Sequence, residues 1–189
     1  EWHELLNSMD PELFVSSTAV ETQSGPIPDL DLAKPEDPAL IAYTSGTTGK
    51  PKGAIHSQRS LLAGALSVVR AWEWTESDCL LLCLPLFHIH GMGIGLHGTL
   101  LVGGSAVLQK GFKQDLLFSE ITENNCSMFF GVPTMYRRLL EDERVGQLSS
   151  LRLCVSGSAP LPADLHKQLK DKGGVDVLER YGTTETMLT

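Results

Sequence analysis

Hydrophobic residues along this chain fall in short runs that alternate with longer amphipathic stretches. The short runs have the length of buried strands, and the stretches between them repeat apolar residues at helical spacing. This alternation is typical of βα units and predicts an α/β fold, with a mostly parallel sheet flanked by helices. The predicted strands are residues 39–43, 53–56, 79–84, 106–109, 127–131, 151–156 and 177–180. The predicted helices are residues 57–72, 90–101, 114–124, 133–142 and 162–172.

The first part of the chain lacks this pattern. Residues 1–38 are polar and contain several prolines and a run of acidic residues. Such a composition is typical of a connecting segment with little core of its own. We therefore expect two regions, a connecting segment over residues 1–38 and an α/β subdomain over residues 39–189.

Composition and charge narrow the class of protein. A hydrophobic content of 42% with 20% charged residues is ordinary for a soluble globular chain. The net charge of −8 argues against a nucleic-acid partner. The longest apolar stretch, residues 92–108, is interrupted by His97 and by glycines, so we expect no membrane span. The four cysteines lie inside apolar runs, which indicates reduced core thiols and a cytoplasmic location.

Residues 44–53 (TSGTTGKPKG) carry the strongest chemical signal. Glycine backbone N–H groups and side-chain hydroxyls can converge on phosphate oxygens here, and Lys50 and Lys52 supply positive charge. The segment is not a P-loop of the form G-x-x-x-x-G-K-S/T, because Pro51 prevents a helix from starting there. An apolar run follows at residues 53–56, so we predict a phosphate-binding loop inside a hairpin. A flexible glycine- and serine-rich turn is the alternative.

Together with three later segments, this loop resembles the adenylate-forming superfamily, which includes acyl-CoA synthetases, peptide-synthetase adenylation domains and luciferases. The later segments are residues 84–91 (LPLFHIHG), 156–161 (SGSAPL) and 180–185 (RYGTTE), in the family's order. The resemblance covers residues 39–189 and implies that these residues form an ATP- or AMP-binding subdomain within the family's large N-terminal domain.

The resemblance also implies a role for each matching residue. Catalytic roles fall to Lys52, His88, Thr184 and Glu185, with Thr184 at the α-phosphate and Glu185 on Mg²⁺. The β- and γ-phosphates of ATP would be held by Thr44, Ser45, Gly46, Thr47, Thr48, Gly49 and Lys52. The rest of the nucleotide would be bound by Gly157, Ser158, Tyr181, Gly182 and Thr184, with Tyr181 flanking adenine. The acid would be bound by His88, Lys110, Gly157 and Thr183.

Other interpretations of these residues stay open. His88 is also consistent with a satisfied core histidine, or with a metal site formed by His88, His90 and His97. The spacing of those three histidines mixes strand and helix periods, and no carboxylate lies between them. Lys110 is equally consistent with a solvated lysine at a strand end.

The implied reaction is the activation of a carboxylic acid. Its carboxylate attacks the α-phosphorus of ATP, pyrophosphate leaves, and the thiol of CoA, a co-substrate, opens the acyl-adenylate to a thioester. Three segments, residues 72–78, 84–91 and 130–136, look closest to malonyl-CoA synthetases and their medium- or short-chain relatives. A dicarboxylic acid would need a cation, for which Arg137, Arg138 and Lys110 are candidates. Thr183 stands where that subgroup usually has Met, which leaves room for a branched or longer acid.

The chain itself is expected to be an incomplete enzyme. The family's ribose-binding Asp, hinge and C-terminal catalytic Lys would follow Thr189, so we expect the missing C-terminal domain to be a partner in catalysis. The isolated chain is then expected to bind ATP weakly and to release no pyrophosphate. The alternatives are an adenylation domain that loads a carrier protein, and a nucleotide-binding fragment without catalysis. We further expect residues 45–52, 88, 156–160 and 181–185 to meet at the carboxyl ends of the strands.

Overall fold

The computed structural model describes residues 33–44 and 50–187. Residues 34–189 group into one unit, separate from residues 1–33. Most of the predicted connecting segment, residues 1–32, lies outside the described residues. Its boundary at residue 38 therefore stays a prediction.

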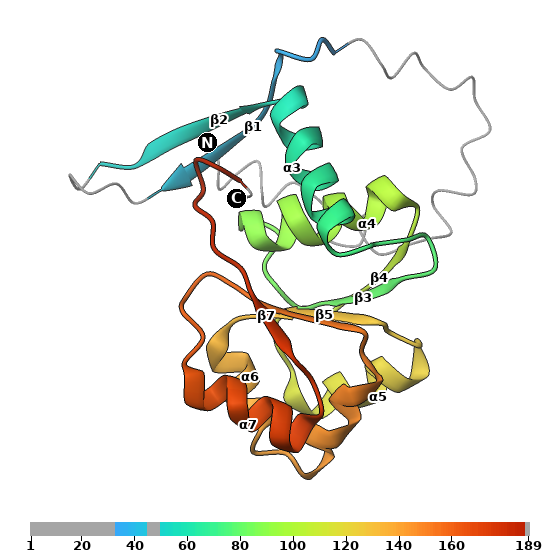
Figure 1. The fold of residues 1–189 in the computed structure, drawn as a ribbon. Coiled ribbons are helices and arrows are strands. Elements are labelled where there is room, and N and C mark those ends of the chain that lie inside the picture. The colour runs from blue at the N-terminus through green and yellow to red at the C-terminus, as the bar shows by residue number, and fades with distance from the viewer. Residues whose placement is uncertain (1–32, 45–49, 188–189) are drawn as a thin grey trace. The chain divides into compact units, whose positions relative to one another are not determined.

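A five-stranded parallel sheet forms the centre of this unit (Figure 1). Its strand order is β4-β3-β5-β6-β7, and every neighbouring pair is parallel. The strands are β3 (Cys79–Leu82), β4 (Ser105–Leu108), β5 (Met128–Gly131), β6 (Leu153–Ser156) and β7 (Val177–Glu179). The predicted α/β fold is confirmed.

Helices cover both faces of this sheet (Figure 1). One face carries α3 (Gln58–Ala71) and α4 (His97–Val102), and the other carries α5 (Gln114–Glu123), α6 (Pro133–Leu139) and α7 (Ala163–Gly173). Successive residues of β3 enter opposite cores: Leu81 packs on the side of α5 and α7, and Leu80 and Leu82 pack on the side of α3. Burial on both faces explains why the three central strands, β3, β5 and β6, are nearly continuously apolar instead of alternating.

Two stretches differ from the predicted helices. The predicted helix 90–101 is a π-helix (His90–Leu96) that continues into α4. Its glycines permit close packing: a Cβ on Gly91 would lie 2.4 Å from the carbonyl oxygen of Pro85. The predicted helix 133–142 ends at Leu139, and a 3₁₀-helix (Glu143–Ser150) that was not predicted follows it. Asp142 begins this helix by accepting a hydrogen bond from the N–H of Arg144.

The two strands that flank the predicted phosphate loop form a sheet of their own. Strand β1 (Pro38–Thr44) pairs antiparallel with β2 (Lys52–Ser57), which confirms the predicted hairpin. The hairpin is not part of the five-stranded sheet, so the prediction that all four motifs lie at one edge of a single sheet is wrong for this motif. A short connection allows antiparallel pairing, whereas a parallel neighbour requires a longer crossover.

The amino ends of three strands are tied together by one charged network. Asp78, just before β3, accepts a hydrogen bond from Arg152 Nε at 2.6 Å and from Ser127 Oγ at 2.7 Å. Ser127 Oγ accepts a hydrogen bond from the N–H of Cys79. Burial alone raises the pKa of Asp78, but hydrogen bonds from Arg152, Ser127 and Thr75 outweigh burial and hold this pKa well below its usual range. The carboxylate is therefore ionised and fully engaged.

The structure also bears on the prediction of reduced core thiols and on the question of a membrane span. All four cysteines are buried free thiols, as predicted. Burial raises the pKa of Cys83 and of Cys154 to about 12, which keeps both protonated. Within residues 33–44 and 50–187, no helix combines the length and the apolar character that crossing a bilayer requires.

Candidate active site

Two adjoining pockets lie beyond the carboxyl ends of β3, β6 and β7. The first has a volume of about 430 Å³ and the second of about 300 Å³. Both pockets are lined by Ser158, Arg180 and Gly182. Such an edge is where ligands bind in open α/β sheets.

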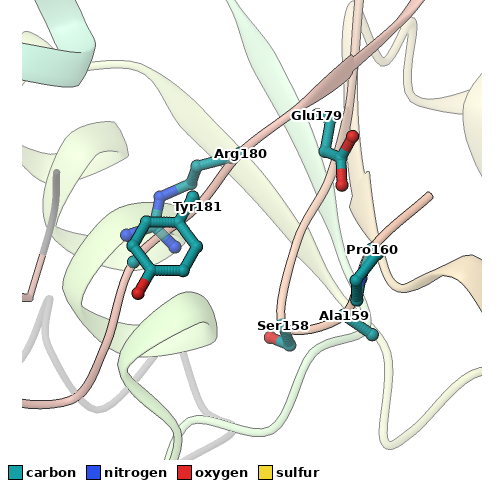
Figure 2. A pocket seen from close by; sticks show the side chains of 7 residues that line it. Ser158, Ala159, Pro160, Glu179, Arg180 and Tyr181 are labelled. Atoms are coloured by element: carbon teal, nitrogen blue, oxygen red, sulfur yellow. The ribbon is translucent and has the colours of Figure 1, made fainter.

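The first pocket lies between the loop after β6 and the end of β7. Figure 2 shows the loop of Ser158, Ala159 and Pro160 on one side and the chain from Glu179 to Tyr181 on the other. Glu179 connects the two sides, because its Oε1 accepts a hydrogen bond from the N–H of Leu161 at 2.9 Å. Ser158 has a left-handed backbone with φ of 66°, which is uncommon for a residue with a Cβ and often marks a functional loop. This pocket therefore has a defined wall on each side.

The second pocket brings together two motifs that are far apart in the sequence. His88 from the segment after β3 lines it together with Thr183, Thr184 and Glu185 from the segment after β7. Thr183 and Thr186 form a tight turn, in which each backbone N–H donates to the other residue's hydroxyl at 3.2 and 3.3 Å. This turn presents Thr184 and Glu185 at the pocket.

His90 is a buried residue of the second pocket. Its ring stacks on Phe130, and its Nδ1 lies 3.3 Å from Ser158 Oγ. A Cβ on Gly157 would lie 2.8 Å from this ring, so the loop after β6 approaches His90 closely only because residue 157 is glycine. Burial, with smaller electrostatic contributions from the neighbouring Arg180 and His88, lowers the pKa of His90 to about 4. The imidazole is therefore neutral at pH 7, and its Nε2 has no hydrogen-bond partner among the described residues.

Arg180 is a pocket residue to which the sequence assigned no role. It lines both pockets, and its Nη2 donates a hydrogen bond to the carbonyl oxygen of Met187 at 2.8 Å. Burial lowers its pKa to about 10, so the guanidinium stays charged at pH 7. Within the part of the chain that the structure describes, its Nε has no partner. A charged residue directly after a buried strand and before the Tyr-Gly-Thr-Thr-Glu segment is the signal that identifies it.

Most of the predicted site residues line these pockets. They are His88, Ser158, Tyr181, Gly182, Thr183, Thr184 and Glu185. Gly157 lies directly behind them, against His90. Thr44 and Lys52 are register partners on the hairpin, and Thr44 Oγ1 lies 3.5 Å from the carbonyl oxygen of Lys52. Five predicted phosphate-binding residues lie outside the described residues: Ser45, Gly46, Thr47, Thr48 and Gly49.

The other candidates do not line either pocket. Lys110 is exposed after β4. Arg137 and Arg138 lie on α6, where Arg138 stacks over the Phe112 ring. His97 lines a groove between α3 and α4 instead, and no group of three His, Cys, Asp or Glu side chains suited to a metal occurs in the described ranges. The metal-site interpretation of the three histidines is therefore not supported.

The chain is similar to a known protein family and to several curated enzymes. The family model described as AMP-binding enzyme matches residues 4–189. Malonate–CoA ligase of Arabidopsis thaliana is 36% identical over 173 residues, which cover 81% of this chain and 28% of that protein. Sulfoacetate–CoA ligase of Cupriavidus necator is 34% identical over 182 residues, which cover 96% of this chain and 35% of that protein.

Solved structures of CoA ligases are also similar to this chain in sequence and in fold. The ternary product complex of a malonyl-CoA ligase with methylmalonyl-CoA and AMP bound is 44% identical, with a TM-score of 0.79, over 84% of this chain and 35% of that one. The chain thus spans about a third of the length of the relatives it matches.

Proposed function

Because this chain belongs to the AMP-binding enzyme family, we propose that it forms the nucleotide- and acid-binding part of an acid–CoA ligase. The complete enzyme would be about three times as long, in line with the relatives. The observation that carries the proposal is the second pocket, where His88, Ser158, Arg180 and the turn at Thr184 meet. Residues from three separate motifs thereby surround one space.

The proposed reaction has two steps. In the first, an oxygen of the acid's carboxylate forms a bond to the α-phosphorus of ATP, and the bond to the pyrophosphate oxygen breaks. In the second, the thiol of CoA adds to the acyl carbon of this mixed anhydride, loses its proton, and AMP leaves. The catalytic contribution of the protein is position and charge, since Lys52 and Thr184 would stabilise the phosphates while His88 lies beside the carboxylate.

A magnesium ion fits this arrangement. Mg²⁺ is usually bound by one or two carboxylates together with substrate phosphates, and Glu185 supplies one carboxylate at the second pocket. We propose that Glu185 holds the ion, which would neutralise part of the charge on the phosphates.

The remaining residue roles are proposals of the same kind. The hairpin loop would hold the β- and γ-phosphates through Thr44, Ser45, Gly46, Thr47, Thr48, Gly49 and Lys52. Tyr181, Gly182 and the Gly157–Ser158 loop would hold the nucleoside. Lys110 is exposed outside both pockets, so its predicted contact with the acid has no support from their lining.

The acid most consistent with the site carries a second anionic group. Arg180 is a partly buried cation at both pockets, and its Nε has no partner among the described residues. A guanidinium binds a carboxylate or a sulfonate with paired hydrogen bonds. Malonate and sulfoacetate, for which two relatives are named, both carry such a group. We therefore propose a short dianionic acid, with Thr183 leaving space for a branch.

An acid panel on the full-length protein tests this function. Acid-dependent pyrophosphate release should be highest with malonate, methylmalonate or sulfoacetate, and added CoA should convert the product to a thioester. Preference for long monocarboxylic acids would contradict the dianionic proposal. If no acid in the panel forms an acyl-adenylate, the proposed ligase function is wrong. If the acyl group is transferred to a carrier protein and not to CoA, the carrier protein is the acceptor.

Arg180→Met gives the sharper test of the acid. The variant should lower kcat/KM for the dianionic acid by about 100-fold, because a charge-assisted pair in a partly buried site is lost. The KM for ATP should change little. Arg70→Met, which removes an exposed arginine on α3 outside both pockets, is the matched control. An equal loss with acetate and malonate would place Arg180 outside the recognition of the second charge.

A further inference from the structure

Strand β2 buries a histidine and exposes the isoleucine beside it. His56 is 4% exposed, whereas Ile55 is 66% exposed. Apolar burial alone would produce the opposite arrangement, since an imidazole buried without a hydrogen-bond partner costs free energy. The inward direction of His56 therefore reflects a specific polar contact.

That contact is with the segment after β7. His56 Nε2 lies 2.8 Å from the carbonyl oxygen of Thr184. A carbonyl oxygen only accepts, so the ring is protonated at Nε2 and donates to Thr184. In Figure 1 this segment runs from β7 up to the β1–β2 hairpin. The hydrogen bond thus joins the two-stranded sheet to the end of the five-stranded sheet.

The same face of the hairpin carries the predicted phosphate-binding positions. Lys52 and His56 are four residues apart on β2 and therefore point to one face. Their register partners on β1 are Thr44 and Leu40. The face that holds Thr44 and Lys52 is thus the face that His56 attaches to Thr184.

We propose that His56 is a positioning residue that aligns the phosphate-binding hairpin with Thr184 and Glu185, so that both act on one triphosphate. The inference rests on the proposed function, because it assumes that these two elements share ATP. Without this hydrogen bond, the β1–β2 hairpin and the segment after β7 would keep their own side chains, but the distance between the two elements would be held less firmly. ATP use should then suffer more than use of the acid.

Two substitutions in the full-length protein test this role. His56→Leu keeps the bulk but removes the donor, and should lower kcat/KM for ATP by about tenfold, the value of one buried hydrogen bond, with the KM for the acid unchanged. His56→Gln places an amide N–H at a similar reach and should recover most of this loss. His97→Leu changes a half-buried histidine outside both pockets and is the matched control, expected to leave kcat/KM for ATP unchanged.

The outcomes separate this inference from the proposed function. If the wild-type protein forms no acyl-adenylate, the proposed function is wrong. In that case, calorimetric titration with ATP measures the ATP affinity of His56→Leu and of wild type. Equal affinities would refute the inference as well. A wild-type ligase in which His56→Leu loses nothing, or in which Gln rescues nothing, refutes the inference alone. Equal losses for ATP and for the acid that follow a lower Tm would assign His56 a purely structural role.

The hydrogen bond of His56 can also be tested in the wild-type protein, so that this test does not depend on the folding of a variant. With ¹⁵N-labelled histidine, NMR should find the His56 proton on Nε2, and its exchange with solvent should slow when ATP binds, because both sides of the bond are then held by one ligand. A proton on Nδ1 only, or exchange that ATP does not change, would overturn the proposal.

Discussion

The two edges of the five-stranded sheet differ in how completely their polar groups are paired. At the amino edge, Asp78 receives hydrogen bonds from Arg152, Ser127 and Thr75, and Ser127 also accepts from a backbone N–H. At the carboxyl edge, five buried side-chain atoms have no partner among the described residues: His90 Nε2, Ser156 Oγ, Arg180 Nε, and the Oε1 and Nε2 of Gln109, which follows β4 directly. The Asp78 network is internally satisfied, whereas the carboxyl edge has unused hydrogen-bonding capacity. Outside this network, Trp74 Nε1 before β3 also has no partner among the described residues.

This difference separates stability from binding. A satisfied charged network fixes the strands relative to one another, whereas unpaired buried groups cost free energy unless a ligand pairs with them. Parallel strands place the loops that can bind a ligand at their carboxyl ends, and these five unpaired atoms lie at that end. Changes at the amino edge should therefore alter unfolding, and changes at the carboxyl edge should alter ligand use.

The largest expected effect comes from breaking the amino edge. Asp78→Asn keeps the shape but leaves Arg152 without its counter-charge, and should lower the free energy of unfolding by about 3 kcal/mol. Urea denaturation followed by tryptophan fluorescence measures this, since Trp72 and Trp74 both contact Phe130 in the nearby core. Folded Asp78→Asn protein should retain the wild-type KM for ATP. A variant as stable as wild type would show that the network is dispensable.

A pH series should distinguish the two edges by the pH at which each loses stability. The pKa of His90 is lowered to about 4 in the folded protein, so the unfolded chain gains a proton first as the pH falls below 6.5. This stability is complete above pH 6.5 and should fall by about 2 kcal/mol between pH 7 and pH 5. The stability that comes from the depressed pKa of Asp78 is instead lost only below about pH 4, where the carboxyl group of the unfolded chain takes up a proton.

His90→Asn isolates the first part of this series. Asparagine does not titrate and keeps an atom near the Nδ1 position, so the fall between pH 7 and pH 5 should shrink while the fall below pH 4 remains. Urea midpoints at pH 7, 5 and 3.5 measure both. An unchanged slope between pH 7 and pH 5 in His90→Asn would contradict a neutral buried imidazole.

The smallest effect comes from one chemical change made at both edges. Ser127→Ala removes a hydroxyl that makes two hydrogen bonds and should cost about 1.5 kcal/mol of unfolding free energy. Ser156→Ala removes a buried hydroxyl without a partner in the described structure and should leave stability within about 0.5 kcal/mol of wild type or raise it. Urea midpoints of both variants give the comparison. Equal costs would mean that the two edges do not differ in this respect.

Much of the fold could be predicted because its signals are local. Apolar runs and amphipathic stretches located every described strand and the helices α3 to α7, with errors of a few residues at their ends. The π-helix could not be predicted, because its form depends on contacts such as that of Gly91 with Pro85. The hairpin was predicted, but its separation from the five-stranded sheet was not, since periodicity does not say which strands pair.

The site was predictable where a motif identified it. His88, Ser158 and residues 181–185 were identified from the sequence and line the pockets. Arg180 and His56 were assigned no role, and His90 was considered only as a possible metal ligand, because the surroundings of each depend on burial and on partners distant in sequence. The bond from His56 to Thr184 spans 128 positions, and no spacing rule connects them.

The sequence by itself determined the class of fold and the order of the elements, and it predicted the residues for phosphate binding, because apolar periodicity and motif composition are properties of neighbours along the chain. The tertiary structure alone decided which of these residues share a pocket, which histidine is buried and neutral, and which cation lines both pockets. Those properties arise from desolvation and from contacts between remote segments. They also explain why the Asp78 network at one edge of the sheet is fully paired while the other edge keeps buried hydrogen-bonding groups without a partner in the described residues.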